Sequence, residues 1–168
     1  MASLISHPAA PLALIFARGE KWSGKLAIIC VLLSCLPDAD AIGFFLGVPY
    51  ESQWGHRGFT HSLAFALMMG LASTFFFREN KKNVFILTTL STFSHPLADM
   101  LTNGGLGVAL WWPITSARYF FPWRPIEVSP IGIANFIGWR GVRVLLSEVL
   151  VLWIPLMSLA FLTKRLGR

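Results

Sequence analysis

Long apolar runs, separated by short polar or basic stretches, dominate this chain. Five such runs are present, at about 4–17, 26–48, 61–78, 83–101 and 142–163. Because ~20 apolar residues match the thickness of a bilayer, each run predicts a helix that crosses or enters a membrane. The pattern therefore predicts an all-α fold: a polytopic membrane helix bundle that forms a single integral membrane domain over residues 1–168.

Prolines and run lengths make the predicted helices uneven. The first and third runs are short, and Pro37 breaks the second run within "LPDAD". Residues 102–141, between the fourth and fifth runs, hold four prolines, which argue against a further spanning helix there. The same stretch contains several Trp residues and a Tyr, which favour the headgroup layer of a membrane. It is therefore predicted to be one long interfacial loop, or a lid.

Composition favours a membrane protein over a soluble one. Hydrophobic residues make up 55% of the chain and charged residues 13%, against about 25% charged in soluble domains. The formal net charge of +6 would suit nucleic acid, but the basic residues gather at the ends of apolar runs, where membrane anchors lie. Nucleic acid is therefore not expected as a partner.

Basic residues also predict the orientation. They form three groups: Arg18, Lys21 and Lys25; Arg78, Lys81 and Lys82; and Lys164, Arg165 and Arg168. If five runs cross the membrane, all three groups fall on one side, which the positive-inside rule assigns to the cytoplasm. We therefore predict a multi-pass protein of a bacterial inner membrane, with its N-terminus outside and its C-terminus cytoplasmic.

Histidines and acidic residues converge on one level of the predicted bundle. Counted at 1.5 Å per helical residue, they lie ~16 to 25 Å from the basic end. The residues at this level are His7, Asp38, Asp40, His61, His95 and Asp99, with His56 just above them. Ionisable residues inside a membrane are costly and need partners, so the convergence predicts one shared polar site. Imidazoles mixed with carboxylates are typical of a metal site.

Local spacing adds chemistry to this site. His95 and Asp99 are four residues apart and share one helix face, a common way to present two ligands to one metal. The third run begins at Thr60, so the positive N-terminal end of its helix points into the same site. Together with Arg57, that end would suit an anionic group such as phosphate.

Structural roles are open for several of these residues taken singly. An intramembrane histidine is more often a hydrogen-bonding group between helices than a ligand, and Asp38 could cap a helix. Glu148 is expected to pair with Arg140 or Arg143 near the membrane interface. Separate roles of this kind do not explain why so many ionisable residues share one level, and a metal site does.

Several motifs resemble those of a known family: "LPDAD", "GHRGFTHS", "SHPLADMLT" and "WWP", with a histidine near the start. They resemble the YdjM-like family of LexA-regulated, inner-membrane-bound, metal-dependent hydrolases. The resemblance covers about residues 7–125, and nothing in the chain looks DNA-binding. It implies divalent-metal binding by the matched residues, which are His7, Asp38, Asp40, His56, His61, His95 and Asp99. Prolines directly after His7 depart from the family pattern, so the first helix is expected to begin later than in relatives.

The leading hypothesis is a membrane-embedded metal-dependent hydrolase acting on a lipid or lipid-linked substrate, with a phosphoester favoured, at the outer side of the membrane. The predicted metal ligands are His7, Asp38, His61, His95 and Asp99. Asp40, His56 and Arg57 are predicted catalytic residues, and Arg57, Thr60, Arg118 and Arg124 are predicted to bind substrate. One or two divalent ions would activate a water, with zinc favoured over magnesium or manganese.

Two other functions remain open. The same histidines and carboxylates could form the transport site of a metal or proton permease, since such chains also relay ions. Permeases of this kind usually carry paired repeats, and no repeat is evident here. A structural metal site without turnover is the third possibility, and a closed shell of four tetrahedral ligands would favour it. No protein partner is indicated.

Overall fold

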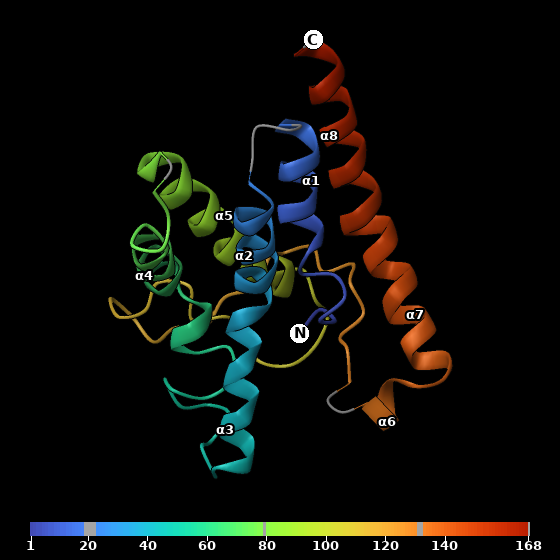
Figure 1. Ribbon diagram of the computed structural model, residues 1–168. Coiled ribbons are helices and arrows are strands. Elements are labelled where there is room, and N and C mark those ends of the chain that lie inside the picture. The colour runs from blue at the N-terminus through green and yellow to red at the C-terminus, as the bar shows by residue number, and fades with distance from the viewer. Residues whose placement is uncertain (19–22, 79, 131–132, 168) are drawn as a thin grey trace.

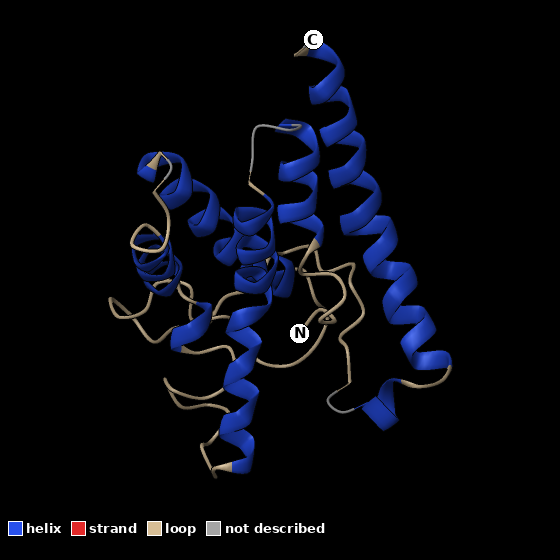
Figure 2. Cartoon of the chain, viewed as in Figure 1, coloured by secondary structure: helices blue, strands red, loops and turns tan. Residues whose placement is uncertain are grey.

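The structure is a computed structural model that describes residues 1–18, 23–78, 80–130 and 133–167, and within them it contains helices and no strand (Figures 1 and 2). The elements in chain order are α1 (Ala9–Arg18), α2 (Gly24–Cys35), η1 (Leu36–Ala41), α3 (Ile42–Phe45), η2 (Phe59–His61), α4 (Leu63–Ser73), α5 (Lys81–Met100), α6 (Ile133–Phe136), α7 (Trp139–Glu148), η3 (Val149–Trp153) and α8 (Ile154–Leu166). η1 and η2 are 3-10 helices, and η3 is π-helical. The predicted all-α fold is confirmed.

Small polar residues set the starts of the apolar helices. Ser23 caps α2 and Ser62 caps α4, each accepting a hydrogen bond from the backbone N–H three residues further on. Asn80 caps α5 in the same way. Such caps satisfy backbone donors that a helix start leaves unpaired. The cap at Ser62 also fixes His61 immediately before the first turn of α4.

Pro37 changes the geometry of the second helix without ending it. Residues Gly24–Phe45 form one continuous helical segment, in which α2 passes into the 3-10 turn η1 at Leu36 and then into α3. Proline has no N–H and its ring clashes with the preceding turn, so the regular α-helical ladder is interrupted there. The tighter turn carries Asp38 and Asp40 into the interior, as the sequence predicted.

Among the described residues, two helices are long and apolar enough to cross a membrane, Gly24–Phe45 and Trp139–Leu166. α1 and α4 have 10 and 11 residues. They are therefore only ~15 to 17 Å long, about half of the ~30 Å hydrocarbon layer. α5 has 20 residues but carries many polar side chains and does not meet the same test. Helices occur in all five predicted segments, but the prediction that about five of them span the membrane is not supported.

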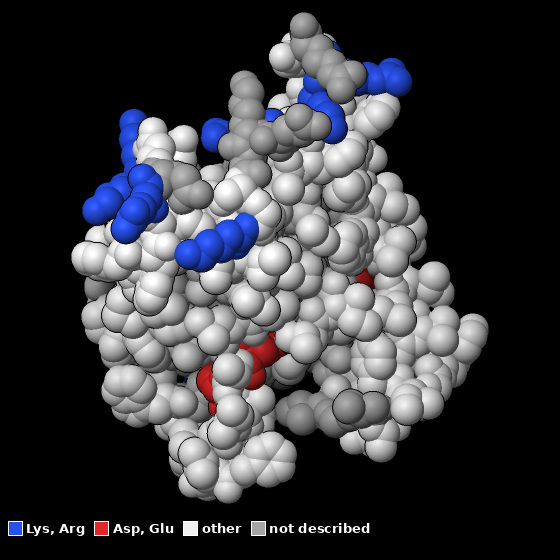
Figure 3. Space-filling view, in the orientation of Figure 1, with Lys and Arg blue, Asp and Glu red and all other residues white. Residues whose placement is uncertain are grey.

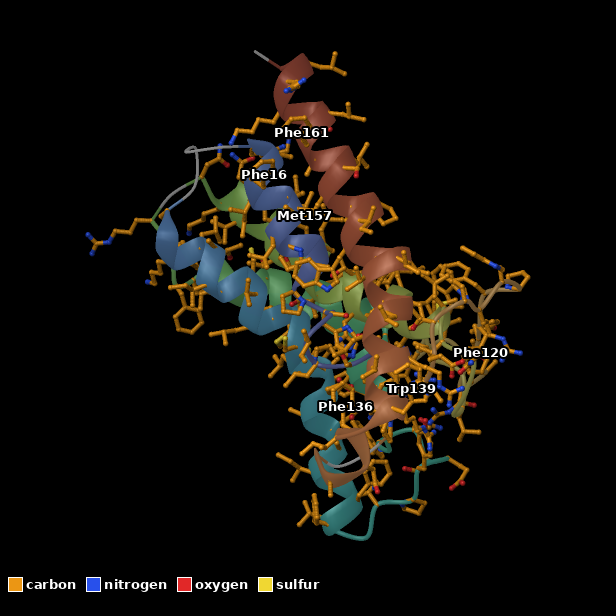
Figure 4. All side chains as sticks on the ribbon, turned by 90° about the vertical axis from the view of Figure 1, so that its right-hand side faces the viewer. Phe16, Phe120, Phe136, Trp139, Met157 and Phe161 are labelled. Atoms are coloured by element: carbon orange, nitrogen blue, oxygen red, sulfur yellow. The ribbon has the colours of Figure 1, made fainter. Side chains whose placement is uncertain are left out.

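α5 lies at the centre of the bundle. α2 and α4 pack against it, while α1 packs mainly against α8 and also contacts α2 and α5 (Figure 1). The side chains of Phe16 on α1 and Phe161 on α8 lie toward one end of the molecule (Figure 4). Phe136 and Trp139 lie toward the other end. The interior near the start of α1 is therefore enclosed by α2, α5 and α8.

Charge is distributed unevenly along the bundle. On the face that Figure 3 shows, the visible Lys and Arg side chains lie toward the end where the C-terminus lies, and the visible acidic side chains lie well away from it. Arg18 stands in the last turn of α1, and Lys164 and Arg165 stand in the last turn of α8. Lys21 and Arg168, which also entered the predicted orientation, lie outside the described residues.

The long connection predicted at residues 102–141 has no spanning helix in its described part. It contains α6, and α7 begins at Trp139, three residues earlier than the apolar pattern indicated. The connection folds back on the end of α5, because the N–H of Phe121 donates to Met100 and the N–H of Ile126 donates to Leu101. These backbone contacts close the polar end of α5.

Candidate metal centre

All seven histidines and aspartates predicted for the site lie together inside the bundle. They come from four parts of the chain: the segment before α1, η1, the loop that leads through η2 into α4, and α5. Asp40 is half-buried, and the others are buried. The residues are His7, Asp38, Asp40, His56, His61, His95 and Asp99. The sequence-based depth argument therefore identified residues that the fold brings together.

A central group of four residues could hold a metal ion. One ligand atom from each of Asp38, His61, His95 and Asp99 lies within 4.8 Å of the others, and all four residues are buried. The Nε2 atoms of His61 and His95 are 3.0 Å apart. Asp38 Oδ1 lies 3.3 Å from His95 Nε2, and Asp99 Oδ2 lies 3.6 Å from His61 Nε2. Zinc bonds of 2.0–2.1 Å imply ~3.3 Å between the ligands of a tetrahedral site.

Hydrogen bonds on the far side of each ring orient the two imidazoles. His95 Nδ1 donates to the backbone carbonyl of Ser34 at 2.7 Å, because a carbonyl can only accept. That carbonyl stands three residues before Pro37, which has no N–H to offer the turn. His61 Nδ1 is hydrogen-bonded to the Thr60 hydroxyl at 3.0 Å, and a carboxylate oxygen of Asp40 lies 3.2 Å from it. A neutral ring held in this way turns an Nε2 lone pair toward the centre.

The centre is therefore rich in acceptors and poor in donors. Both carboxylate oxygens of Asp38 are buried and have no hydrogen-bond partner among the described residues. Two imidazole lone pairs and two carboxylates that face one another repel, and buried polar atoms without partners are costly. A cation bound between them would remove both problems. The donor set thus fits a divalent metal, although it does not determine which one.

Asp40 and His56 form a supporting group beside this centre. Asp40 Oδ1 accepts from His56 Nδ1 at 2.6 Å. Its other oxygen accepts from the Thr60 hydroxyl at 2.6 Å and from the Arg57 N–H at 3.2 Å. Asp40, His56 and His61 also lie close enough to be considered as metal ligands. Unlike Asp38, however, Asp40 already has donors on both oxygens.

Arg57 is a fully buried arginine in an unusual backbone conformation, with φ at 64°. Its Nε donates to Asp99 Oδ2 at 3.0 Å. The remaining guanidinium nitrogens donate to the carbonyls of Gly104 and Leu106 and to the Thr102 hydroxyl. A left-handed conformation at a non-glycine residue persists where the surroundings impose it. Arg57 therefore positions and compensates Asp99, and every nitrogen of its guanidinium is engaged.

The other predicted substrate-binding residues lie in different settings. Arg118 donates to the carbonyls of His56, Gly107, Tyr50 and Ser52, which ties the loop before η2 to the long connection. Burial lowers the pKa of the Arg118 guanidinium from its usual value. Arg124 is exposed and its guanidinium lies 4.8 Å from the centre of the Phe120 ring. Thr60 donates to Asp40, as described above. Their roles in substrate binding stay predictions.

Glu148 has partners that the sequence did not indicate. Instead of an arginine, its carboxylate accepts from the Ser3 N–H, from the Ser3 hydroxyl at 2.7 Å and from the Ser6 hydroxyl at 2.7 Å. The expected pairing with Arg140 or Arg143 is wrong for the described residues, because the fold places the N-terminal segment against the end of α7. The sequence could not predict these contacts, because the partners are far apart along the chain. Glu148 lies 142 or more residues from Ser6 and Ser3, and Ser34 lies 61 residues from His95.

His7 stands at the edge of the central group. Its ring stacks on that of His95, with ring centres 3.5 Å apart and planes 15° from parallel. Its Nε2 lies 3.6 Å from Asp38 Oδ2 and 3.9 Å from Asp99 Oδ1. His7 lies two residues before α1, which begins at Ala9. That the first helix begins later than in relatives stays a prediction.

An apolar groove leads away from His7 between α1, α5 and α8. It consists of two adjoining cavities of about 340 and 420 Å³, which share the lining residues Ala10, Ser94, Leu97 and Leu156. The first cavity includes His7, and the second extends to Arg18 and Thr163. We call this feature the α1 groove. It connects the polar centre with the basic end of the bundle.

In its described part, the fold contains two helices able to cross a bilayer, and it encloses a buried histidine–aspartate cluster that could hold a metal ion. These features define a membrane protein with a candidate metal centre. The family described as "YdjM inner membrane protein" matches residues 1–166, so the chain belongs to this family. The membership predicted from the motifs is confirmed, and the match extends over the last helix as well.

Two curated relatives give the degree of similarity. The chain is 38% identical to the inner membrane protein YbcI of Escherichia coli K12 over 164 residues, which covers 95% of each chain. It is 36% identical to the inner membrane protein YdjM of the same organism over 117 residues, which covers 62% of this chain and 56% of the relative. No solved structure matches the chain.

Proposed function

We propose that this protein is a metal-dependent hydrolase of the bacterial inner membrane that acts on a lipid or lipid-linked phosphoester. One observation carries the proposal: the Nε2 atoms of His61 and His95 lie 3.0 Å apart beside the carboxylates of Asp38 and Asp99, and one ligand atom from each of these four buried residues lies within 4.8 Å of the others. Zinc suits this mixture of imidazole and carboxylate best, and magnesium or manganese are the alternatives. The bound metal would lower the pKa of a coordinated water and polarise the scissile group.

The residues around the metal would supply the remaining functions. His56, oriented by Asp40 through its Nδ1, is proposed as the general base. Arg57 would hold Asp99 in place and offset its charge, since its Nε donates to that carboxylate. Arg118 and Arg124 lie on the long connection and are proposed to attract the anionic headgroup. The positive electrostatic potential of such arginines raises the local concentration of a negatively charged substrate.

The α1 groove supports a lipid as the substrate. It begins at His7, and its lining is mostly alanine, leucine and phenylalanine. α1 extends beside it for ~15 Å, which is half of a ~30 Å hydrocarbon layer. A lipid whose headgroup reaches the metal centre could therefore place one hydrocarbon chain in the groove. A soluble substrate would have no use for an apolar channel that leads to the catalytic residues.

The distribution of charge supports an orientation. The basic end of the bundle would face the cytoplasm, as the positive-inside rule requires, and the C-terminus would lie there. The metal centre and the N-terminal residues would lie toward the outer side. The names of the relatives YbcI and YdjM support placement in the inner membrane. In this arrangement the two long helices cross the bilayer, and the shorter ones enter it from either side.

The proposal is tested on protein purified in detergent. Metal content is measured by elemental analysis, and hydrolysis is screened with phospholipids and polyprenyl phosphates. His95→Ala should abolish both bound metal and hydrolysis, whereas Ser91→Ala, one turn earlier on α5, should retain both. Full metal content in His95→Ala would overturn the assignment of the centre. A metal-loaded wild type that hydrolyses no phosphoester would overturn the proposed reaction.

Transport is separated from hydrolysis by a flux assay. Wild-type protein is reconstituted into sealed liposomes that contain a metal-sensitive dye, and a metal gradient is applied. A hydrolase gives no metal flux above that of empty liposomes. Flux that His95→Ala abolishes would instead identify a permease that uses the same residues.

A further inference from the structure

We infer that the centre holds a second divalent cation, bound between His7 and the oxygens of Asp38 and Asp99 that face away from His61 and His95. The inference rests on the proposed metal centre and makes it dinuclear. It assigns a ligand role to His7 that differs from that of the other histidines, because His7 would bind only the second ion.

The two carboxylates are shared between two sets of neighbours. Asp38 Oδ1 faces His95 and His61 at 3.3 and 3.7 Å, while its Oδ2 faces His7 at 3.6 Å. Asp99 repeats the pattern, with Oδ2 at 3.6 Å from His61 and Oδ1 at 3.9 Å from His7. Each carboxylate thus offers one oxygen to either side, which is the arrangement of a bridging ligand between two ions.

His7 is an orphaned polar side chain aimed into this position. His7 is 2% exposed, and neither nitrogen of its ring has a hydrogen-bond partner among the described residues. Its ring centre lies 3.5 Å from that of His95, and the two rings are nearly parallel. Ions held by these two stacked rings would be separated by a similar distance, and paired metal ions in hydrolytic sites are ~3.5–4 Å apart.

Hydrogen bonds anchor the segment that precedes His7. Ser3 and Ser6 hydrogen-bond to the buried carboxylate of Glu148, which anchors the segment that leads to His7. The N–H of Ala2 donates to Asp99 Oδ1 at 2.6 Å, and that oxygen keeps a second lone pair for a cation. This anchoring suits a ligand, because a metal site requires its donors to be positioned before binding.

A competing location for a second ion is the group of Asp40, His56 and His61. There the two oxygens of Asp40 already accept from Thr60, the Arg57 N–H and His56. A cation would have to displace those donors, whereas Asp38 has none to displace. The unpartnered atoms therefore favour the His7 side over the Asp40 side.

The experiment counts metal ions in detergent-purified protein. The protein is stripped with a chelator, loaded with zinc or manganese, and freed of loose metal before elemental analysis. Wild type should bind two ions per chain. His7→Ala should bind one, and His56→Ala, which removes a ligand of the competing location, should still bind two. Manganese-loaded wild type should also give the electron paramagnetic resonance spectrum of a coupled pair, and His7→Ala that of an isolated ion.

Each result decides between the possibilities. One ion in wild type overturns the second position, and retained hydrolysis would then leave the proposed function intact. Loss of the second ion in His56→Ala but not in His7→Ala places it with Asp40 and overturns the inference. No bound metal at all removes the proposed function as well. If His7→Ala does not fold, as judged by its thermal unfolding, His7→Asn replaces it and should likewise bind one ion.

Discussion

Asp38 and Asp40 are the same residue type, two positions apart on η1, and both lie against His61. Their surroundings nevertheless differ completely. Asp38 has no hydrogen-bond donor on either oxygen among the described residues, and the Nε2 atoms of three histidines lie 3.3 to 3.7 Å from its oxygens. Asp40 accepts from a histidine, a hydroxyl and a backbone N–H.

The difference separates a ligand from a supporting residue. A carboxylate that is surrounded by acceptors is stable only when a cation neutralises it, whereas one that is surrounded by donors is stable without a cation. We therefore propose that Asp38 binds the metal directly and that Asp40 acts through the ring of His61. Residue type and spacing alone would have given both the same role. The following changes test this contrast, in order of their expected effect on metal affinity.

Asp38→Asn should have the largest effect. Loss of a directly bound carboxylate should lower metal affinity by more than the ~10–100-fold typical of supporting residues. The metal-free protein should become more stable, because the amide can donate to His95 Nε2, which lies 3.3 Å from Asp38 Oδ1. Competition with a chelator measures the affinity, and thermal unfolding in excess chelator measures the stability. A metal-free variant less stable than wild type would contradict the account of Asp38.

Asp40→Asn should lower metal affinity by ~10–100-fold, as expected for a residue that orients a ligand. In contrast to Asp38→Asn, it should destabilise the metal-free protein by about 1.5 kcal/mol or more, because hydrogen bonds to a charged acceptor are lost. The same two measurements apply. If Asp38→Asn and Asp40→Asn both stabilise, or both destabilise, the metal-free protein, the proposed difference between the two aspartates is wrong.

Thr60→Val removes one donor from Asp40 and keeps the shape of the side chain. We expect a loss of about 1 kcal/mol in the free energy of unfolding, since one hydrogen bond to Asp40 at 2.6 Å is lost. Metal affinity should fall by less than ~10-fold, below the range for Asp40→Asn. An effect as large as that of Asp40→Asn would indicate that Thr60 contacts the metal or its bound water.

Ala10→Phe should leave metal affinity unchanged while it fills the α1 groove where the two cavities join. Hydrolysis of long-chain phosphoesters should fall, and that of short-chain phosphoesters should be retained. Ala17→Phe, farther from His7, serves as the matched control and should affect only the longest chains. The chain-length profile of hydrolysis provides the measurement. A loss that does not depend on chain length would remove the groove from substrate binding.

Much of the site could be predicted from the sequence because polar residues within apolar runs need polar partners inside the bundle. His7, Asp38, His61 and His95 interrupt apolar runs, and a membrane helix tolerates such residues only where they meet partners. Depth along each run then placed them at one level. The same reasoning failed for the number of spanning helices, because it treated every apolar run as a span. α1 and α4 are too short to cross alone and complete the bundle instead.

The division of roles within the site could not be predicted. It depends on which atoms donate to which, and those contacts join distant segments: Ser34 with His95, Thr60 with Asp40, and Ser3 with Glu148. Arg57 shows the limit most clearly. Its place in "GHRGF" suggested an anion-binding side chain, but the folded loop surrounds its guanidinium with carbonyls and Asp99. Sequence patterns indicate proximity and say little about hydrogen-bond direction.

The contact between Ser3 and Glu148 has a consequence for how the protein is made. The segment that carries His7 is synthesised well before its anchor, because the carboxylate that accepts from Ser3 lies 145 residues later in the chain. Until α7 has been inserted, a nascent chain can gather the three later histidines around η1 and α5 while its earliest one stays unanchored. A product that stalls before α7 would therefore present an incomplete centre, and full metal loading would report that α7 has been inserted.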